Sequence, residues 1–160
     1  MAPPARFLAS PNTARLRFKD GVPDITGLPS DTITNRAGEP YMHRYFLEGA
    51  PTVTPSIRLH HILLSDEDLY LHDHPWDFVT LLLAGRYVET TDTGDTEHTA
   101  PTALYRRAED PHRLTLPDGP VWTYVTTGQA RRTWGFWTDE GWIGWRQNAS
   151  QDANSSNADR

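Results

Sequence analysis

The residues of this sequence best suited to chemistry are two histidines, His72 and His74, separated by a single residue. Alternate side chains of a β-strand share one face, so in a strand both imidazoles point the same way and can bind one metal ion. Most metals held by such a pair need at least a third protein ligand. The alternative is that the pair is two polar side chains at a strand edge, with no metal.

Composition limits both the ligands and the partners. The 160 residues include seven histidines and no cysteine, so a metal must be held by imidazole, carboxylate or backbone oxygen. The net charge of −6 argues against a binder of duplex nucleic acid, which needs a basic face. No apolar run approaches the ~20 residues of a membrane helix, and the N-terminus lacks a secretory-signal pattern. We therefore expect a cytoplasmic protein that binds a small molecule, without nucleic-acid or membrane partners.

The middle of the chain is punctuated like an all-β protein. Short runs rich in Val, Ile, Leu, Thr, Tyr and Trp alternate with turn residues, and no long segment has a helical period. We expect one domain over 15–146, a loose arm at 1–14, a disordered tail at 147–160 and room for a short helix before residue 41. The turn spacing predicts a sandwich or barrel. Its expected strands are 41–47, 56–64, 69–74, 76–83, 85–91, 102–108, 112–116, 120–126, 131–138 and 141–146.

The histidines occur in a recognisable order: His72 and His74, then Gly85 at a tight turn, then His112 in the second half of the chain. In this pattern residues 41–146 resemble the cupin superfamily, whose first motif carries a His-x-His pair and a later glycine, and whose second motif carries a further histidine. The leading glycine of the first motif is replaced here by Asp66. The glycine of the second motif is replaced by Glu109. The resemblance implies a double-stranded β-helix, or jelly-roll barrel.

The resemblance also implies that His72, His74 and His112 are the metal ligands. The motif glutamate should stand at position 78 or 79, but the sequence has Phe78 and Val79 there. In this respect the sequence is similar to three-histidine variants among thiol dioxygenases and diketone-cleaving dioxygenases, which favours Fe(II) and leaves Zn, Mn or Ni open. Asp77 can join the ligands only if Pro75 introduces a bulge, because Asp77 otherwise points to the opposite face.

Other side chains are expected to line a pocket beside these ligands. An arginine on an inward strand face is costly unless it meets an anion, so Arg58, Arg106 or Arg132 is a candidate clamp for an acidic substrate. His60 shares a face with Arg58. His43, His60 and His61 are each either hydrogen-bonded structural residues or pocket members, and His98 is expected on the surface. The candidate catalytic residues are His60, Arg58, Asp77 and Arg106, and the candidate pocket residues are Trp76, Phe78, Tyr105, Arg132 and Trp134.

These features favour a metal-dependent enzyme of the Fe(II) dioxygenase type that acts on a small organic substrate in bacterial specialised or amino-acid-related metabolism. The same ligands also suit a redox-neutral isomerase, lyase or hydrolase. A metal-free enzyme that uses a His–Asp pair as base and a non-catalytic ligand-binding module are further alternatives. The resemblance implies a homodimer, and the aromatic residues near the C-terminus suit either core packing or a dimer contact.

Overall fold

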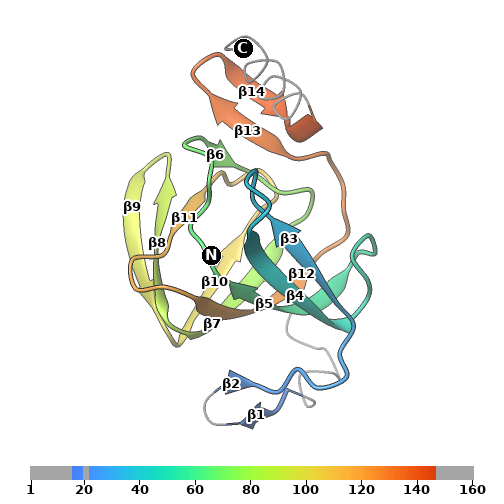
Figure 1. Ribbon diagram of the computed structural model, residues 1–160. Helices are drawn as coiled ribbons and strands as arrows, with labels where there is room; N and C mark the ends of the chain where they lie inside the picture. The colour runs from blue at the N-terminus through green and yellow to red at the C-terminus, as the bar shows by residue number, and fades with distance from the viewer. Residues whose placement is uncertain (1–15, 20–21, 147–160) are drawn as a thin grey trace.

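The structure is a computed structural model that describes residues 16–19 and 22–146. The expected arm at 1–14 and tail at 147–160 lie outside the described residues. Strands dominate the described chain, as the all-β prediction requires (Figure 1). No helix in the described part is long and apolar enough to cross a membrane.

Strands that are distant in the sequence pair in one six-stranded antiparallel sheet and two three-stranded sheets (Figure 1). The six-stranded sheet has the order β10 (Thr102–Arg106), β7 (Phe78–Ala84), β12 (Val121–Thr127), β5 (Ser56–Ile62), β4 (Pro40–Glu48) and β3 (Ser30–Thr34). One small sheet contains β11 (Arg113–Thr115), β8 (Arg86–Thr91) and β9 (Gly94–Thr99), and the other contains β14 (Gly141–Gly144), β13 (Gly135–Thr138) and β6 (Leu71–His72). The short pair β1 (Phe18–Lys19) and β2 (Val22–Pro23) lies apart from them.

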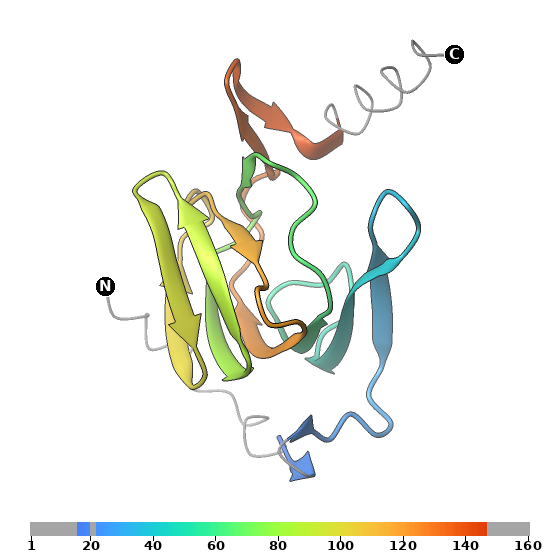
Figure 2. The same ribbon diagram turned by 60° about the vertical axis from the view of Figure 1, so that its left-hand side comes forward.

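Figure 2 shows the β8–β9 hairpin on one side of the molecule and β3 and β4 on the other, with the chain around β6 between them. Inside, Ile62, Leu82, Tyr87 and Val121 form a buried core cluster. Tyr87 belongs to β8, and the other three belong to the six-stranded sheet. This arrangement of facing sheets confirms the predicted jelly-roll barrel.

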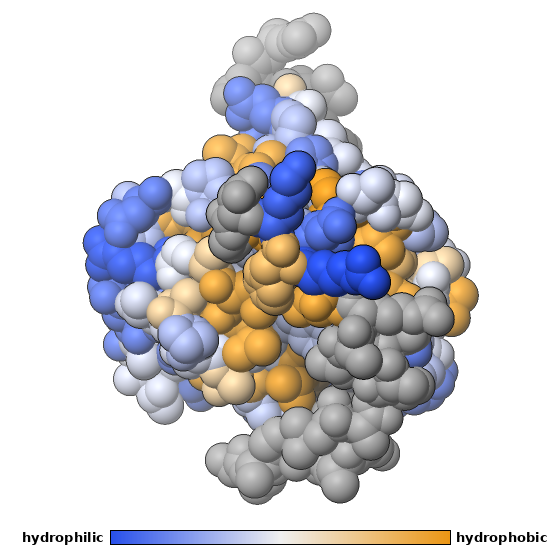
Figure 3. Space-filling view, turned by 90° about the horizontal axis from the view of Figure 1, so that it is seen from below, coloured by the Kyte–Doolittle hydropathy of each residue, from blue (hydrophilic) through white to orange (hydrophobic). Residues whose placement is uncertain are grey.

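The six-stranded sheet is apolar on its other face as well. Ile57, Leu59 and Tyr124 form a second cluster there, against which Leu16, Ile25 and Leu28 pack. Because side chains alternate along β5, Arg58 and His60 face the interior instead. In the view from below, apolar residues gather in the middle of the face and hydrophilic residues at its left-hand edge (Figure 3).

The structure corrects three details of the sequence prediction. In the described part of the chain before residue 41 there is no helix; this part holds strand β3, whose Thr32 and Ile33 are β-branched and pair with β4. Strand β9 was not predicted because its sequence is entirely polar, yet it pairs with β8 over its full length. The expected strand 69–74 shortens to Leu71–His72, and Leu69 is 84% exposed.

Tight turns hold the strands in register. Gly85 connects β7 to β8 at a φ of 85°, a left-handed conformation that favours glycine. A Cβ atom at this position would also lie 2.8 Å from a methyl carbon of Val121. The glycine that matched the cupin motif therefore forms the turn that connects the six-stranded sheet to the sheet of β11, β8 and β9.

Candidate metal centre

Three imidazoles converge at one point on the barrel interior. Ligand atoms of His72, His74 and His112 all lie within 4.8 Å of one another. The Nε2 atoms of His74 and His112 are 2.9 Å apart. Two nitrogens that each bind one ion at about 2.1 Å lie roughly 3.0–3.4 Å apart for right-angled to tetrahedral geometry, so little adjustment is needed to bind an ion.

Backbone pairing brings these ligands together. His72 and His112 form an isolated antiparallel bridge in which each N–H donates to the other's carbonyl at 2.9 Å. Directly opposed residues of an antiparallel pair project their side chains to the same face. The N–H of His74 donates to the carbonyl of Ala108 at 3.0 Å, which anchors the second ligand to the same loop. The chain segments that carry the motifs are therefore hydrogen-bonded to each other at the ligands.

A buried carboxylate lies behind the third ligand. Glu89 of β8 is 2% exposed and accepts a hydrogen bond from Nδ1 of His112 at 2.7 Å. This bond leaves Nε2 of His112 free to bind a metal, which is the usual role of a carboxylate behind a ligating histidine. Burial by itself would raise the pKa of Glu89, but hydrogen bonds from His112 and Arg106 lower that pKa to about 2. Glu89 is therefore an anion across the physiological range.

Glu89 was not among the site residues predicted from the sequence, and two of its partners lie elsewhere than expected. Arg106, expected as a substrate clamp or catalytic group, donates to Glu89 and does not line the cavity. His98, expected on the surface, lies 3.0 Å from a Glu89 oxygen and is largely covered. The available signal was the alternation in β8, which places Tyr87 and Glu89 on the same buried face. An acidic residue at an inward position of a strand needs partners.

A second carboxylate, Asp66, lies near the first ligand. One Asp66 oxygen is 3.7 Å from Nδ1 of His72, and the other oxygen accepts the hydroxyl of Tyr41. Burial and the charge of Asp66 raise the pKa of Tyr41 well above 10, so its phenol keeps its proton. Burial lowers the pKa of His72 and lowers that of His74 well below its usual value. The neutral imidazoles that result are the form that binds metals.

Aromatic rings surround the histidines, as the sequence predicts for three of four residues. Trp76 stacks on His74 at 5.0 Å between ring centroids, and Phe78 meets His74 edge-on at 4.7 Å from the buried side. Trp134 lies 6.4 Å from His72 and lines the cavity. Tyr105 does not line it. The rings limit the approach of water to the imidazoles.

Asp73, between the two paired ligands, ties the metal segment to the last hairpin. It is fully buried and accepts hydrogen bonds from the backbone N–H of Gly135 and from the indoles of Trp137 and Trp142. Arg132, expected in the pocket, is paired with Asp73 at 2.7 Å and does not line the cavity. A Cβ on Gly135 would lie 2.1 Å from the carbonyl oxygen of Ile143 in the adjacent strand, so only glycine fits there.

Three further residues considered in the sequence analysis, Asp77, His61 and His43, do not line the cavity. Asp77 accepts from the N–H of Ala108 and from Arg131, and it is not part of the histidine cluster. His61 stacks on Trp122 at 4.2 Å, and His43 contacts His61 and accepts or donates to Thr32, so neither lines the cavity. The two histidines therefore have structural partners of their own.

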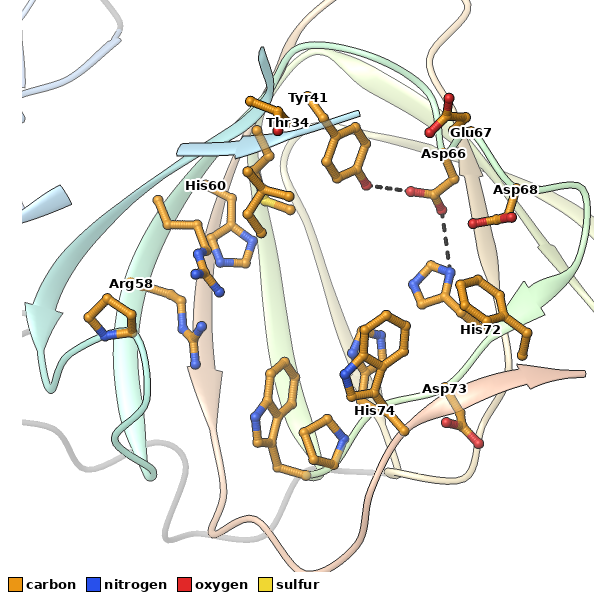
Figure 4. Close-up of a pocket in the computed structure, with 18 of the residues that line it drawn as sticks. Thr34, Tyr41, Arg58, His60, Asp66, Glu67, Asp68, His72, Asp73 and His74 are labelled. Atoms are coloured by element: carbon orange, nitrogen blue, oxygen red, sulfur yellow. Dashed lines mark hydrogen bonds and ion pairs between the residues drawn. The ribbon is translucent and has the colours of Figure 1, made fainter. Parts of the chain in front are cut away.

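Two of the three ligands, His72 and His74, line a cavity of about 620 Å³, large enough for a small organic molecule. Figure 4 shows His72 and His74 on one side of it and Arg58 and His60, from β5, on the other. Tyr41 and Asp66 lie on a third side. Arg58, His60, Trp76 and Trp134 are thus the predicted site residues, besides His72 and His74, that line this cavity.

His60 should make the stability of the metal-free protein depend on pH. Burial, and then the charges of Arg58 and Arg44, lower the pKa of His60 well below 6.5. The unfolded chain therefore binds more protons than the folded chain between about pH 6.5 and the lower folded pKa. We expect the free energy of unfolding to fall as the pH drops below about 6.5, and His60→Gln to weaken this dependence, in urea titrations with chelator. An unchanged slope in the variant would contradict this assignment.

Comparison with known proteins finds similar structures but no similar sequences. No family model matches the sequence, and no curated protein matches it. Among solved structures, 153 chains match. A cupin 2 conserved barrel domain protein from Rhodopseudomonas palustris has a TM-score of 0.59 and 13% identity over 78% of this chain and 86% of that chain. A cupin-2 domain protein from Rhodospirillum rubrum has a TM-score of 0.57 and 13% identity over 72% and 79% of the two chains.

Enzymes are also among the matches. A sugar phosphate isomerase of the cupin superfamily from Silicibacter pomeroyi has a TM-score of 0.52 and 13% identity over 75% of this chain and 88% of that chain. The Fe(II) form of HppE has a TM-score of 0.52 and 12% identity, and the match covers 70% of this chain and 63% of HppE. The match to a DMSP lyase spans 48% of that chain at a TM-score of 0.46. At identities this low the likeness concerns architecture: this chain has the cupin fold, and its three-histidine cluster fits a metal-binding cupin.

Proposed function

We propose that this protein is a metal-dependent cupin enzyme, with Fe(II) held by His72, His74 and His112, that oxidises a small organic substrate with O₂. One observation carries the proposal. Three imidazoles converge beside a cavity of substrate size that His72 and His74 line, and no carboxylate belongs to the cluster in the described residues. When bound, Fe(II) would supply electrons to O₂, with ligand positions left open for substrate.

The residues around the cluster suit this role. Glu89 fixes the ring orientation of His112 through its 2.7 Å hydrogen bond, so that Nε2 points to the other ligands. Trp76 and Phe78 cover His74 from two sides and restrict water near the reacting atoms. The cavity beyond them has room to hold a substrate against the histidines.

The test is a measurement of metal content and oxygen consumption on protein purified without a histidine tag. We expect about one equivalent of metal per chain, and Fe(II)-loaded protein that consumes O₂ only when a substrate from a panel of small organic molecules is present. Turnover of the same substrate under strict anaerobic conditions would overturn the oxidative reaction. Protein that is fully active without any metal would overturn the metal-dependent enzyme.

A redox-neutral reaction is the second candidate, and one observation favours it. Tyr41 lines the cavity as a protonated phenol whose hydroxyl donates to Asp66, next to His72. Such a pair can hold a proton at the phenol oxygen and exchange it with a substrate, as an isomerase or lyase requires. Tyr41→Phe would then abolish anaerobic turnover, whereas an oxidative reaction that needs no acid would retain most of its rate.

A further inference from the structure

One of the three arginines that the sequence offers as an anion clamp is left without a carboxylate. Arg106 is paired with Glu89, and Arg132 is paired with Asp73. Arg58 lines the cavity, and its guanidinium makes no ion pair with any described residue. The structure thereby distinguishes among candidates that the sequence left equivalent.

The guanidinium of Arg58 is held rigidly in place. Arg58 is 2% exposed, and its Nε and Nη2 atoms both donate to the hydroxyl oxygen of Ser56, at 3.0 and 2.6 Å. The hydroxyl of Ser56 in turn lies 3.1 Å from that of Thr127. The faces of Trp76 and Phe46 lie 5.3 and 5.7 Å from the Arg58 Cζ atom. Such a fixed planar fork suits recognition of an oxyanion.

The positive charge on Arg58 has no carboxylate partner of its own among the described residues. Burial and the neighbouring charge of Arg44 lower the pKa of Arg58 to about 10, so the group remains cationic at neutral pH. Asp31, whose charge opposes this shift, is itself bound by Arg44 at 2.5 and 2.8 Å. A buried charge without an opposite charge is costly to the folded state. An anion bound from the cavity would offset that cost.

A second group beside Arg58 also lacks a partner. The Nε2 atom of His60, two residues along the same strand face, is buried and makes no hydrogen bond within the described residues. Buried polar atoms of this kind are rare in folded proteins. His60 and Arg58 lie on the same side of the cavity in Figure 4.

The position of Arg58 relative to the metal ligands defines what kind of molecule fits. Trp76 contacts both Arg58 and His74, so a single indole separates the clamp from the metal cluster. The opposite rim of the cavity carries Asp66, Glu67 and Asp68, which repel an acidic group. An organic anion would therefore enter with its acidic group toward Arg58 and its other end toward the histidines.

We propose that Arg58, with His60 beside it, binds the acidic group of the substrate, and that the substrate is a short organic acid, carrying a carboxylate or a phosphonate. The orientation toward the histidines rests on the proposed function, whereas binding of the acidic group does not. Arg58 acts here as a substrate-binding and specificity-determining residue.

The experiment measures binding of small fluorinated probes by ¹⁹F NMR to the metal-loaded full chain. The probes are 3,3,3-trifluoropropionate, its neutral amide and trifluoroethylphosphonate, and comparison of the two acids identifies the preferred oxyanion. We expect each acid that fits to bind at least about 10-fold more tightly than the amide, and Arg58→Gln to weaken acid binding about 10- to 100-fold while leaving amide binding unchanged. Arg58→Lys, which keeps the charge and loses the fork, should retain part of the affinity.

Controls separate this proposal from folding and from metal chemistry. Arg86→Gln removes the same charge from an arginine that pairs with Glu97 and Asp118 and does not line the cavity, and it should leave acid binding intact. Circular dichroism of Arg58→Gln and Arg58→Lys checks that both variants are folded. Equal affinity for acid and amide in the wild type, or unchanged acid binding in folded Arg58→Gln, would overturn the proposal.

The outcome also stays distinct from that of the proposed function. In metal-free His112→Ala protein the acid should still bind through Arg58, whereas an anion that ligates the metal would be lost with it. Wild-type protein that binds the acid through Arg58 but neither binds metal nor turns over a substrate would retain the clamp and reject the enzyme. Acid binding that disappears with the metal would reject the clamp and retain the enzyme.

Discussion

His112→Ala protein is expected to bind Fe²⁺ or Zn²⁺ at least about 100-fold more weakly than the wild type, and to lose the proposed activity. Loss of a group behind a ligand already weakens metal binding about 10- to 100-fold, so loss of the ligand itself has the larger effect. His112 is one of three nitrogen donors within 4.8 Å, and two imidazoles alone hold an ion poorly. Competition with a chromophoric chelator measures the affinity, and His72→Ala and His74→Ala should behave in the same way.

His61→Ala is the matched control for this prediction. His61 lies in the same barrel but stacks on Trp122, and it does not line the cavity. We expect metal affinity in this variant within about twofold of the wild type, because the His61 imidazole does not contact the ligands and does not face the cavity. Equal metal affinity of His112→Ala and His61→Ala would mean that the ion binds elsewhere.

Glu89→Gln is expected to have the second largest effect, on both stability and metal binding. The carboxylate of Glu89 is 2% exposed and interacts with His112, His98 and Arg106. The glutamine side chain lacks the negative charge that offsets Arg106. Its amide NH₂ group would also face N–H donors of the same partners, which need an acceptor. Removing one member of such a buried pair costs about 3–5 kcal/mol. Metal affinity should fall about 10- to 100-fold, because His112 loses its orienting partner.

Denaturant titration of the metal-free protein separates the stability effect from the metal effect. Glu97→Gln is the control, since Glu97 is an exposed acid on β9 that pairs with the exposed Arg86. Surface pairs of this type contribute about 0–1 kcal/mol, so that variant should be nearly unchanged. Wild-type stability and metal affinity in Glu89→Gln would refute the role assigned to the carboxylate.

The sequence was sufficient to predict the barrel and a pair of histidines on one side of the chain, because both depend on local patterns. Alternation in β5 and β7 separated the two faces of each strand, and His-x-His spacing placed two imidazoles on one side of the chain. The turn at Gly85 required a residue that tolerates positive φ, which glycine does. These features need no knowledge of which strand pairs with which.

The partners of the site were not predictable because they depend on tertiary pairing. Arg106 meets Glu89 only because β10 and β8 lie on facing parts of the barrel, and that proximity has no signature in either strand. The polar strand β9 has no apolar alternation to reveal it, and its pairing with β8 alone defines it. For the same reason Arg58, Arg106 and Arg132 were equivalent candidates for an anion clamp from the sequence, although their surroundings in the structure differ.

The link between Asp73 and the last hairpin has a consequence for how the protein is made. Gly135, Trp137 and Trp142, which donate to Asp73, leave the ribosome only after all three histidines have been synthesised. A nascent chain therefore exposes its ligands before the segment that carries them can settle. Contacts between residues so far apart in sequence also form slowly in folding. The segment that carries His72 and His74 is thus expected to reach its final position only after the last hairpin has been synthesised.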